Sequence, residues 1–215
     1  NANTTGTVQY NAALGYEALE LDANTTGTVT NNVAVGHQAL KSVSNTSGTI
    51  QYNTAVGSKA LDVCVASNNT AVGSSALTAN TTGASNTAVG SGSLAANVSG
   101  DSNVGIGLGA LEAVTGGDAN VGIGRDAGYN TTEGEYNISM GYQSKPSAVD
   151  TDNEITIGKA LTGKGAGTGY YGGNSAIYSE TNGTAWNQVS DQRIKKNIED
   201  NNTGLGVIKK VKIRN

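Results

Sequence analysis

The chain is poor in the residues that build an ordinary globular core and most catalytic sites. Its 215 residues include no Phe and only one each of Trp, Pro, Met, His and Cys. Charged residues make up 14%, against roughly 25% in an average domain. One Cys excludes a disulfide framework within the chain, and a lone His cannot make a metal site by itself. The apolar residues are mostly Ala and Val, and Gly is abundant, at 31 residues.

Nine of the glycines are regularly spaced along most of the chain. Their spacings are 21, 21, 16 and then 17 residues, at Gly15, Gly36, Gly57, Gly73, Gly90, Gly107, Gly124, Gly141 and Gly158. Around them the sequence repeats, as in NTAVGSKAL from Asn53 and NTAVGSSAL from Asn69. A fixed period through most of a chain indicates repeated units stacked along one axis.

The repeat length predicts an all-β fold, a parallel β-solenoid (β-roll). Seventeen residues are too few for a helix–turn–helix unit, so each repeat is interpreted as one coil of two short strands and two turns. One strand precedes the glycine, and the other is the run ending in Ala-Leu. Within a strand, Ala55 and Val56 should face opposite ways. The regularly spaced glycine should lie where a Cβ would clash with the neighbouring coil or chain.

Small apolar side chains bury little surface in each coil. Burial contributes roughly 25 cal/mol per Å², whereas ordering one residue costs about 1–2 kcal/mol. A single chain folded into such a thin stack would therefore be only marginally stable. We therefore expect several chains to associate around one axis.

The repeat N-[TV]-A-[VI]-G-x-x-A-L resembles the head repeat of YadA-type trimeric autotransporter adhesins. The resemblance covers about residues 1–165 and includes eight near-copies in phase. It implies a left-handed parallel β-roll with three chains to a head. The coils of this chain are longer than the commonest repeat of that family. Their extra residues fall in the N-T-T-G turns, which we expect to be outward loops.

A Gly- and Tyr-rich connector is expected over residues 166–189, and a different sequence follows. The run SDQRIKKNI from Ser190 resembles the opening of the C-terminal intramolecular chaperone domain of phage tail fibres and tailspikes. That resemblance implies scission at the Ser190–Asp191 junction by a dyad of Ser190 and Lys195. A lysine with a lowered pKa can remove the serine proton without a histidine. Because residues 190–215 are much shorter than that domain, we expect it to be incomplete here.

Charge changes sign along the same boundary. Residues 1–189 hold 6 Lys/Arg and 14 Asp/Glu, a net −8, and residues 190–215 hold 7 and 3, a net +4; together they give the total of −4. The basic end lacks interleaved aromatic residues, and the acidic repeats would repel phosphate. We therefore expect no nucleic-acid partner.

Other candidate sites are weak. The glycines Gly105, Gly107 and Gly109 lie within a repeat, without the helix and lysine of a nucleotide loop, and GGDANVGIG from Gly116 occurs once, unlike Ca²⁺-binding repeats. His37 is expected on a coil surface. Cys64 is interpreted as a small buried side chain or as an interchain contact near the axis. The N-x-[ST] sequons, as at Asn80 and Asn130, follow from turn composition. We expect no metal and no cofactor.

Three functions are compatible with these patterns. The first is a structural and adhesive segment of a trimeric phage tail fibre on the virion, with a host cell-surface glycan or protein as receptor and other tail proteins as partners. The alternatives are a bacterial trimeric autotransporter adhesin at the cell surface and a depolymerase tailspike, although the carboxylates are too scattered in sequence to suggest a glycosidase pair. Enzymatic activity is expected to be at most one self-cleavage.

The expected binding surface lies in the variable turns, because connecting segments can change without disturbing the stack. Tyr10, Tyr16, Tyr52 and the side chains at the two positions after each regularly spaced glycine are the candidates. We expect no membrane insertion. The chain does not begin with Met and opens within a repeat, so we expect the natural protein to extend in both directions.

Overall fold

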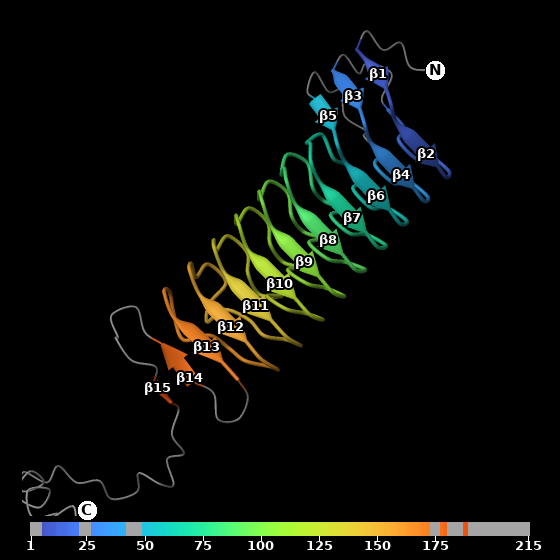
Figure 1. The fold of residues 1–215 in the computed structure, drawn as a ribbon. Coiled ribbons are helices and arrows are strands. Elements are labelled where there is room, and N and C mark those ends of the chain that lie inside the picture. Colours follow the sequence, from blue (N-terminus) through green and yellow to red (C-terminus); the bar gives the residue numbers. More distant parts are fainter. Residues whose placement is uncertain (1–5, 22–26, 42–48, 173–176, 180–186, 189–215) are drawn as a thin grey trace, which may run out of the picture.

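The computed structural model is a parallel β-solenoid whose coils stack along one axis (Figure 1). It describes residues 6–21, 27–41, 49–172, 177–179 and 187–188. This part of the chain contains strands and no helix, so the prediction of an all-β solenoid is confirmed. The strands are β1 (Val8–Gln9), β2 (Ala12–Leu14), β3 (Thr28–Thr30), β4 (Val33–Val35), β5 (Thr49–Gln51), β6 (Thr54–Val56), β7 (Thr70–Val72), β8 (Thr87–Val89), β9 (Val104–Ile106), β10 (Val121–Ile123), β11 (Ile138–Met140), β12 (Ile155–Ile157), β13 (Gly169–Tyr171), β14 (Ile177–Ser179) and β15 (Asn187–Gln188).

Two sheets run along the stack. The long sheet has the order β15-β14-β13-β12-β11-β10-β9-β8-β7-β6-β4-β2, and a short sheet has the order β1-β3-β5. Pairing is parallel and in step from β2 to β13, and antiparallel between β13 and β14 and between β14 and β15. The parallel stack therefore continues to Gly169–Tyr171, within the segment expected to be a connector.

The strand content of a coil differs from the sequence prediction. The 21-residue coils do have two strands, but the second one lies before the Asn of the repeat, in β1, β3 and β5. The run that follows the glycine is a turn in each coil up to that of β10. After β11 and β12 the turn is shorter, and an isolated parallel bridge joins Lys145 and Thr162. The shorter coils from β7 to β12 have one strand each. Residues 22–26 and 42–48, which carry the N-T-T-G turn and its equivalent, lie outside the described residues.

Left-handed backbone conformations explain why the Ala-Leu run bends. The second residue after each of these glycines has positive φ, and from Gly15 to Gly124 the fourth residue does too, as at Lys59 (58°) and Leu61 (53°). This conformation turns the chain instead of extending it. The turns still join neighbouring coils, because the Leu61 N–H donates to the Ala76 carbonyl at 3.1 Å.

Small side chains fill the interior. From β3 to β12 the middle residue of each three-residue strand faces inward and is fully buried, as at Ala55 and Ala71, and Leu61 and Leu77 close the opposite side of the core. Val56 is half-buried and faces outward. The predicted alternation of Ala55 and Val56 is confirmed.

The regularly spaced glycines lie against the backbone of the next coil. All nine have positive φ, between 112° and 150°. A Cβ on Gly57 would lie 2.5 Å from the carbonyl oxygen of Gly73. The predicted clash with a neighbouring coil is confirmed, and it explains why these positions exclude every side chain.

Candidate functional site

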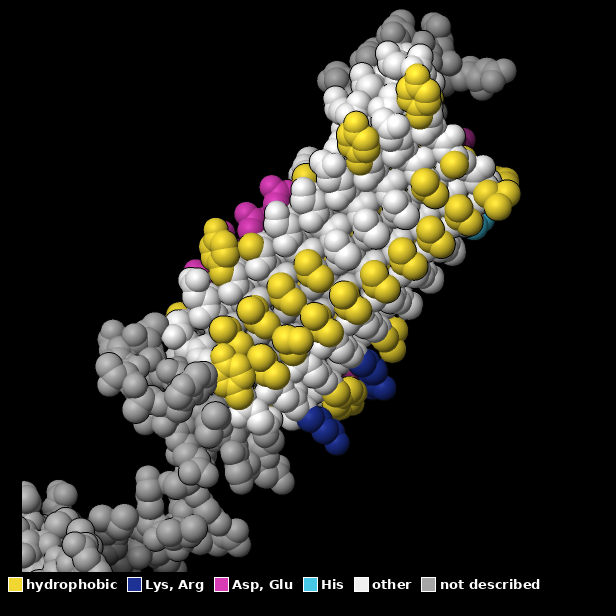
Figure 2. Space-filling view, viewed as in Figure 1, with side chains coloured by type: hydrophobic (Ala, Val, Ile, Leu, Met, Phe, Trp, Pro, Cys, Tyr) yellow, Lys and Arg dark blue, Asp and Glu magenta, His cyan; other side chains and the backbone are white. Residues whose placement is uncertain are grey.

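The outer face of the long sheet is a continuous apolar surface. We define it as the side chains at the third position of the long-sheet strands from β4 to β12, together with those at the first position from β9 to β12. The third position is apolar in each: Val35, Val56, Val72, Val89, Ile106, Ile123, Met140 and Ile157. These side chains are half-buried or exposed, with 38% of Val89 and 39% of Ile106 accessible. Figure 2 shows them as a long apolar row.

A second row joins the first toward the C-terminal coils. The first strand position carries Thr54, Thr70 and Thr87 and then changes to Val104, Val121, Ile138 and Ile155. From β9 onward both outward-facing positions are therefore apolar, and the two rows lie side by side in Figure 2. Contiguous apolar surface of this kind is typical of a protein–protein contact.

A group of cations and tyrosines occupies the turns after β10, β11 and β12. We call it the cation edge and define it as Arg125, Tyr129, Tyr142, Lys145 and Lys159. The Arg125 guanidinium lies 5.0 Å from the centre of the Tyr142 ring, and its Nη2 lies 3.4 Å from the Tyr142 hydroxyl. The Lys145 ammonium lies 4.9 Å from the centre of the Tyr129 ring and donates to its hydroxyl at 2.7 Å.

Carboxylates gather on the opposite edge of the sheet, where Figure 2 shows the Asp and Glu side chains. One column has a carboxylate in four successive coils, at Asp101, Asp118, Glu135 and Asp152. Three of them accept backbone N–H groups of the preceding coil: Asp101 from Ala84, Asp118 from Asp101, and Asp152 from Glu135, at 2.7–2.8 Å. Carboxylates that are scattered in sequence thus align in space, and they join neighbouring coils.

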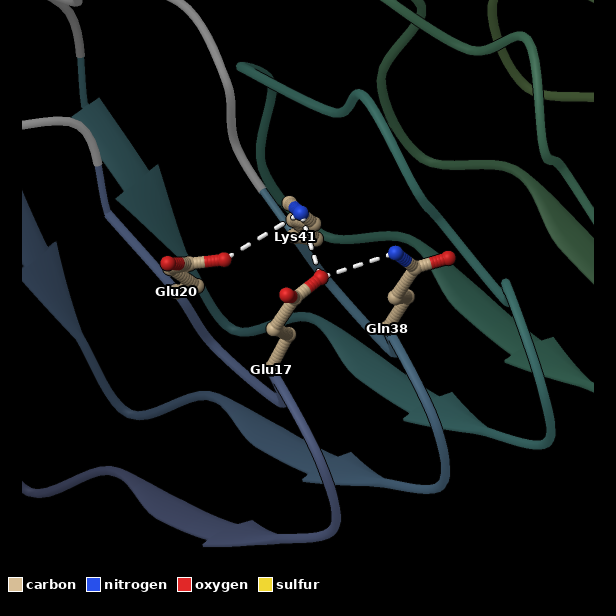
Figure 3. Close-up of polar contacts among 4 residues, drawn as sticks. All are labelled: Glu17, Glu20, Gln38 and Lys41. Atoms are coloured by element: carbon tan, nitrogen blue, oxygen red, sulfur yellow. Dashed lines mark hydrogen bonds and ion pairs between the residues drawn. The ribbon is translucent and has the colours of Figure 1, made fainter.

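A charged cluster joins the first two coils (Figure 3). The Glu17 carboxylate accepts from Gln38 Nε2 at 2.8 Å and from Lys41 Nζ at 2.5 Å, and Lys41 also lies 3.2 Å from Glu20. These hydrogen bonds, chiefly that from Gln38 and then that from Lys41, lower the pKa of Glu17 to about 2. The bond to Glu17 raises the pKa of Lys41. We call Glu17, Glu20, Gln38 and Lys41 the clamp, because their ion pairs and hydrogen bonds join the first two coils.

The tyrosines named from the sequence are exposed. Tyr10 and Tyr52 occupy the corner before the Asn of the repeat with positive φ, and 80% of Tyr10 is accessible. Tyr16 stacks on His37 with ring centres 5.5 Å apart, and His37 is itself exposed, so the prediction of a surface His37 is confirmed. Tyr136 occupies the same corner position and is also exposed, although it is not among the tyrosines predicted from the sequence.

The single cysteine and a representative sequon lie inside the coils. Cys64 is fully buried, and burial raises the pKa of its thiol to about 11. Its sulfur contacts Asn69 Nδ2 at 3.8 Å and Asn80 Nδ2 at 3.7 Å. A thiol in this position does not face another chain. Asn80 is likewise fully buried, which explains its sequon as turn chemistry.

Ser190, Asp191 and Lys195, the predicted scission site, lie outside the described residues. In the described part of the chain, no group of three or more His, Cys, Asp or Glu side chains is arranged to hold a metal ion. The same part contains no helix of the length and hydrophobicity needed to cross a membrane.

Aligning the repeats on their glycines would have revealed three of the five residues of the cation edge. The residue after the glycine is Ser58, Ser74 and Ser91 in the middle coils, and then Arg125, Tyr142 and Lys159 in the last three. All lie in one column of the stack. These positions belong to the predicted binding surface, in which the basic group is not distinguished from the rest.

Comparison of the chain with protein-family models, with curated proteins and with solved structures finds no match.

Proposed function

We propose that this chain is a structural and adhesive segment of a trimeric viral tail fibre that attaches a virion to its host surface. The observation that carries the proposal is the continuous apolar outer face of the long sheet on a stacked coil rod. A rod of stacked coils can extend from the virion toward the host surface. Its apolar face offers a contact site for further copies of the same chain.

The outer face supports association because its side chains are accessible in the single chain. Val72, Val89 and Ile106 lie in consecutive strands, each with more than a third of its surface accessible. Covering such rows is favourable in proportion to the area removed from water. The count of three chains and the left-handed coil are implied by the resemblance to YadA-type heads, and both stay predictions.

The assignment to a virion depends on the order of the segments. YadA-like coils come first, and the run at Ser190 that resembles a tail-fibre chaperone domain comes last. In a bacterial autotransporter adhesin a stalk follows the head, whereas in this chain the run at Ser190 follows the coils. Scission at the Ser190–Asp191 junction also stays a prediction, and the intact mass of the expressed chain, with and without Ser190→Ala, tests it.

Sedimentation equilibrium of the full chain tests the assembly, and a competition assay tests attachment. We expect a mass of three chains, and we expect purified protein added to host cells before infection to slow adsorption of the virus. A monomer, or a trimer that leaves adsorption unchanged, contradicts the proposal.

A further inference from the structure

We propose that the cation edge binds a carboxylate-bearing polysaccharide. The inference deepens the proposed attachment function, on which it rests, by naming a place on the rod and a class of ligand.

The first step is the stacking of one column across three coils. Arg125, Tyr142 and Lys159 each follow a regularly spaced glycine, so they occupy equivalent positions in successive coils. The Arg125 guanidinium lies 5.0 Å from the Tyr142 ring centre, and 56% of the Arg125 side chain is accessible. A guanidinium presents parallel N–H groups that match both oxygens of a carboxylate.

The spacing of the cations suits a polymer. Adjacent coils are about 4.8 Å apart, so Arg125 and Lys159, two coils apart, are separated by about 10 Å along the rod axis. This is roughly the length of a disaccharide. Tyr129 and Lys145, in the turns after β10 and β11, provide a second ring–cation pair beside this column. An extended chain with a carboxylate on alternate sugars could contact both cations and lie across the ring between them.

The cations are not explained by contacts within the fold. Within the described residues, Lys145 and Lys159 pair with no carboxylate, and Arg125 alone among the cation-edge residues has such a partner, Asp126 at 3.2 Å. Exposed ring–cation pairs contribute little to stability. Coils with Ser74 or Ser91 at this position stack in the same register. Four of the six Lys and Arg in the described part nevertheless lie between residues 125 and 164.

A sugar polymer fits this edge better than a nucleic acid. A nucleic acid carries a charge at every phosphate, whereas a polymer with a carboxylate on alternate sugars is less densely charged, so the acidic repeats repel a nucleic acid more strongly. The exposed Tyr rings offer apolar faces to sugar rings. Asp126 and Gln143, whose side chains are 3.4 Å apart, offer an acceptor and a donor to hydroxyl groups.

Binding of the full chain to soluble polymers tests the inference. The probes are polygalacturonate, hyaluronate and polysialic acid, with neutral dextran and oligothymidylate as comparisons, at physiological ionic strength. The variants are Tyr142→Ala and the double change Arg125→Gln with Lys159→Gln. Lys59→Gln is the matched control, because it removes a cation from an equivalent turn outside the cation edge. Thermal unfolding and solution mass confirm that each variant is assembled like the wild type.

We expect at least one acidic polysaccharide to bind and dextran not to bind. Both cation-edge variants should lower the affinity at least about tenfold, equivalent to about 1.4 kcal/mol, and Lys59→Gln should leave it unchanged. The inference is overturned if no acidic polysaccharide binds, if the variants bind like the wild type, or if oligothymidylate binds equally well. If the protein is a trimer that slows virus adsorption but does not bind these polymers, this inference alone is wrong. If it is a monomer that binds them, the assembly proposal alone is wrong.

Discussion

The backbone N–H of Asn69 donates a hydrogen bond to Oδ1 of Asn53, 2.9 Å away in the preceding coil. The contact recurs at every coil, through Asn11, Asn32, Asn53, Asn69, Asn86, Asn103, Asn120 and Asn137, and it ends at Glu154. Each Asn from Asn32 to Asn137 also donates from Nδ2 to a backbone carbonyl, as Asn69 does to Gly83 at 2.9 Å. The leading Asn residues of successive repeats therefore form a buried polar ladder, which fixes the register of the stack.

Replacing one member of this ladder should destabilise the rod. In Asn86→Ala the backbone N–H of Asn103 loses its acceptor, which lies at 2.8 Å. An orphaned buried donor costs about 1–3 kcal/mol, so the free energy of unfolding should fall by that amount in denaturant titrations at fixed protein concentration. Thr87→Ala, at the outward-facing neighbour, is the control and should change stability far less. Equal effects of the two changes would show that the ladder has no special role.

The position of a glycine decides whether it can be replaced. A Cβ at Gly73 would lie 2.5 Å from the Gly90 carbonyl oxygen, at a φ of 139°. Gly92 has a φ of 67° and open space around the added atom, and Ser75 occupies the equivalent position one coil earlier with a φ of 58°. Gly73→Ala should therefore destabilise by more than about 3 kcal/mol or prevent folding. Gly92→Ala should cost about 1–2 kcal/mol. The guanidinium denaturation midpoints of the two variants test this difference. Equal shifts of both midpoints from that of the wild type would refute the distinction.

The stack itself could be predicted because its causes are local. The period of the glycines sets the coil, and the alternation of Ala55 and Val56 sets which residue is buried. The place of the second strand could not be predicted, because Lys59 and Leu61 take left-handed conformations that their residue types do not demand. Inter-coil hydrogen bonds hold the backbone there, and these exist only once the coils are stacked.

The candidate sites were predictable where both partners share a position in the repeat. Arg125 and Tyr142 each follow a glycine by one residue, so their contact follows from the register. Glu17 and Gln38 each follow by two. The partner Lys41 follows by five residues, so its approach to Glu17 depends on how the turn bends. That bend is a property of the folded coil.

The clamp between the first two coils should make stability depend on pH in acid. Because the pKa of Glu17 falls from 4.5 to about 2 on folding, the folded state favours the ionised carboxylate. Its contribution is fully present above about pH 4.5 and is lost as the pH falls through about 2. The unfolding temperature of the wild type should exceed that of Glu17→Gln at pH 7, and the two should converge near pH 2.

A charge-matched control isolates this effect. Asp62→Asn also removes one carboxylate, but Asp62 makes no hydrogen bond or ion pair with any described residue. The unfolding temperature of this variant should therefore follow that of the wild type from pH 7 to pH 2. High salt should narrow the gap at pH 7, because the clamp is at the surface and is screened. Parallel curves for the wild type and Glu17→Gln from pH 7 to pH 2 would refute the clamp.

Association through the outer face of the long sheet should be sensitive to a buried charge. Ile106 lies in the third position of β9, within the doubled apolar rows, and 39% of its surface is accessible. Val98 is similarly accessible, at 43%, but it lies in a turn outside the sheet. Ile106→Lys would place an unpaired ammonium in the contact, where desolvation disfavours it. We expect at least about tenfold weaker association, or about 1.4 kcal/mol, by sedimentation. Val98→Lys should associate like the wild type. If Val98→Lys dissociates the assembly and Ile106→Lys does not, the chains associate through the turns, and the apolar rows need another explanation.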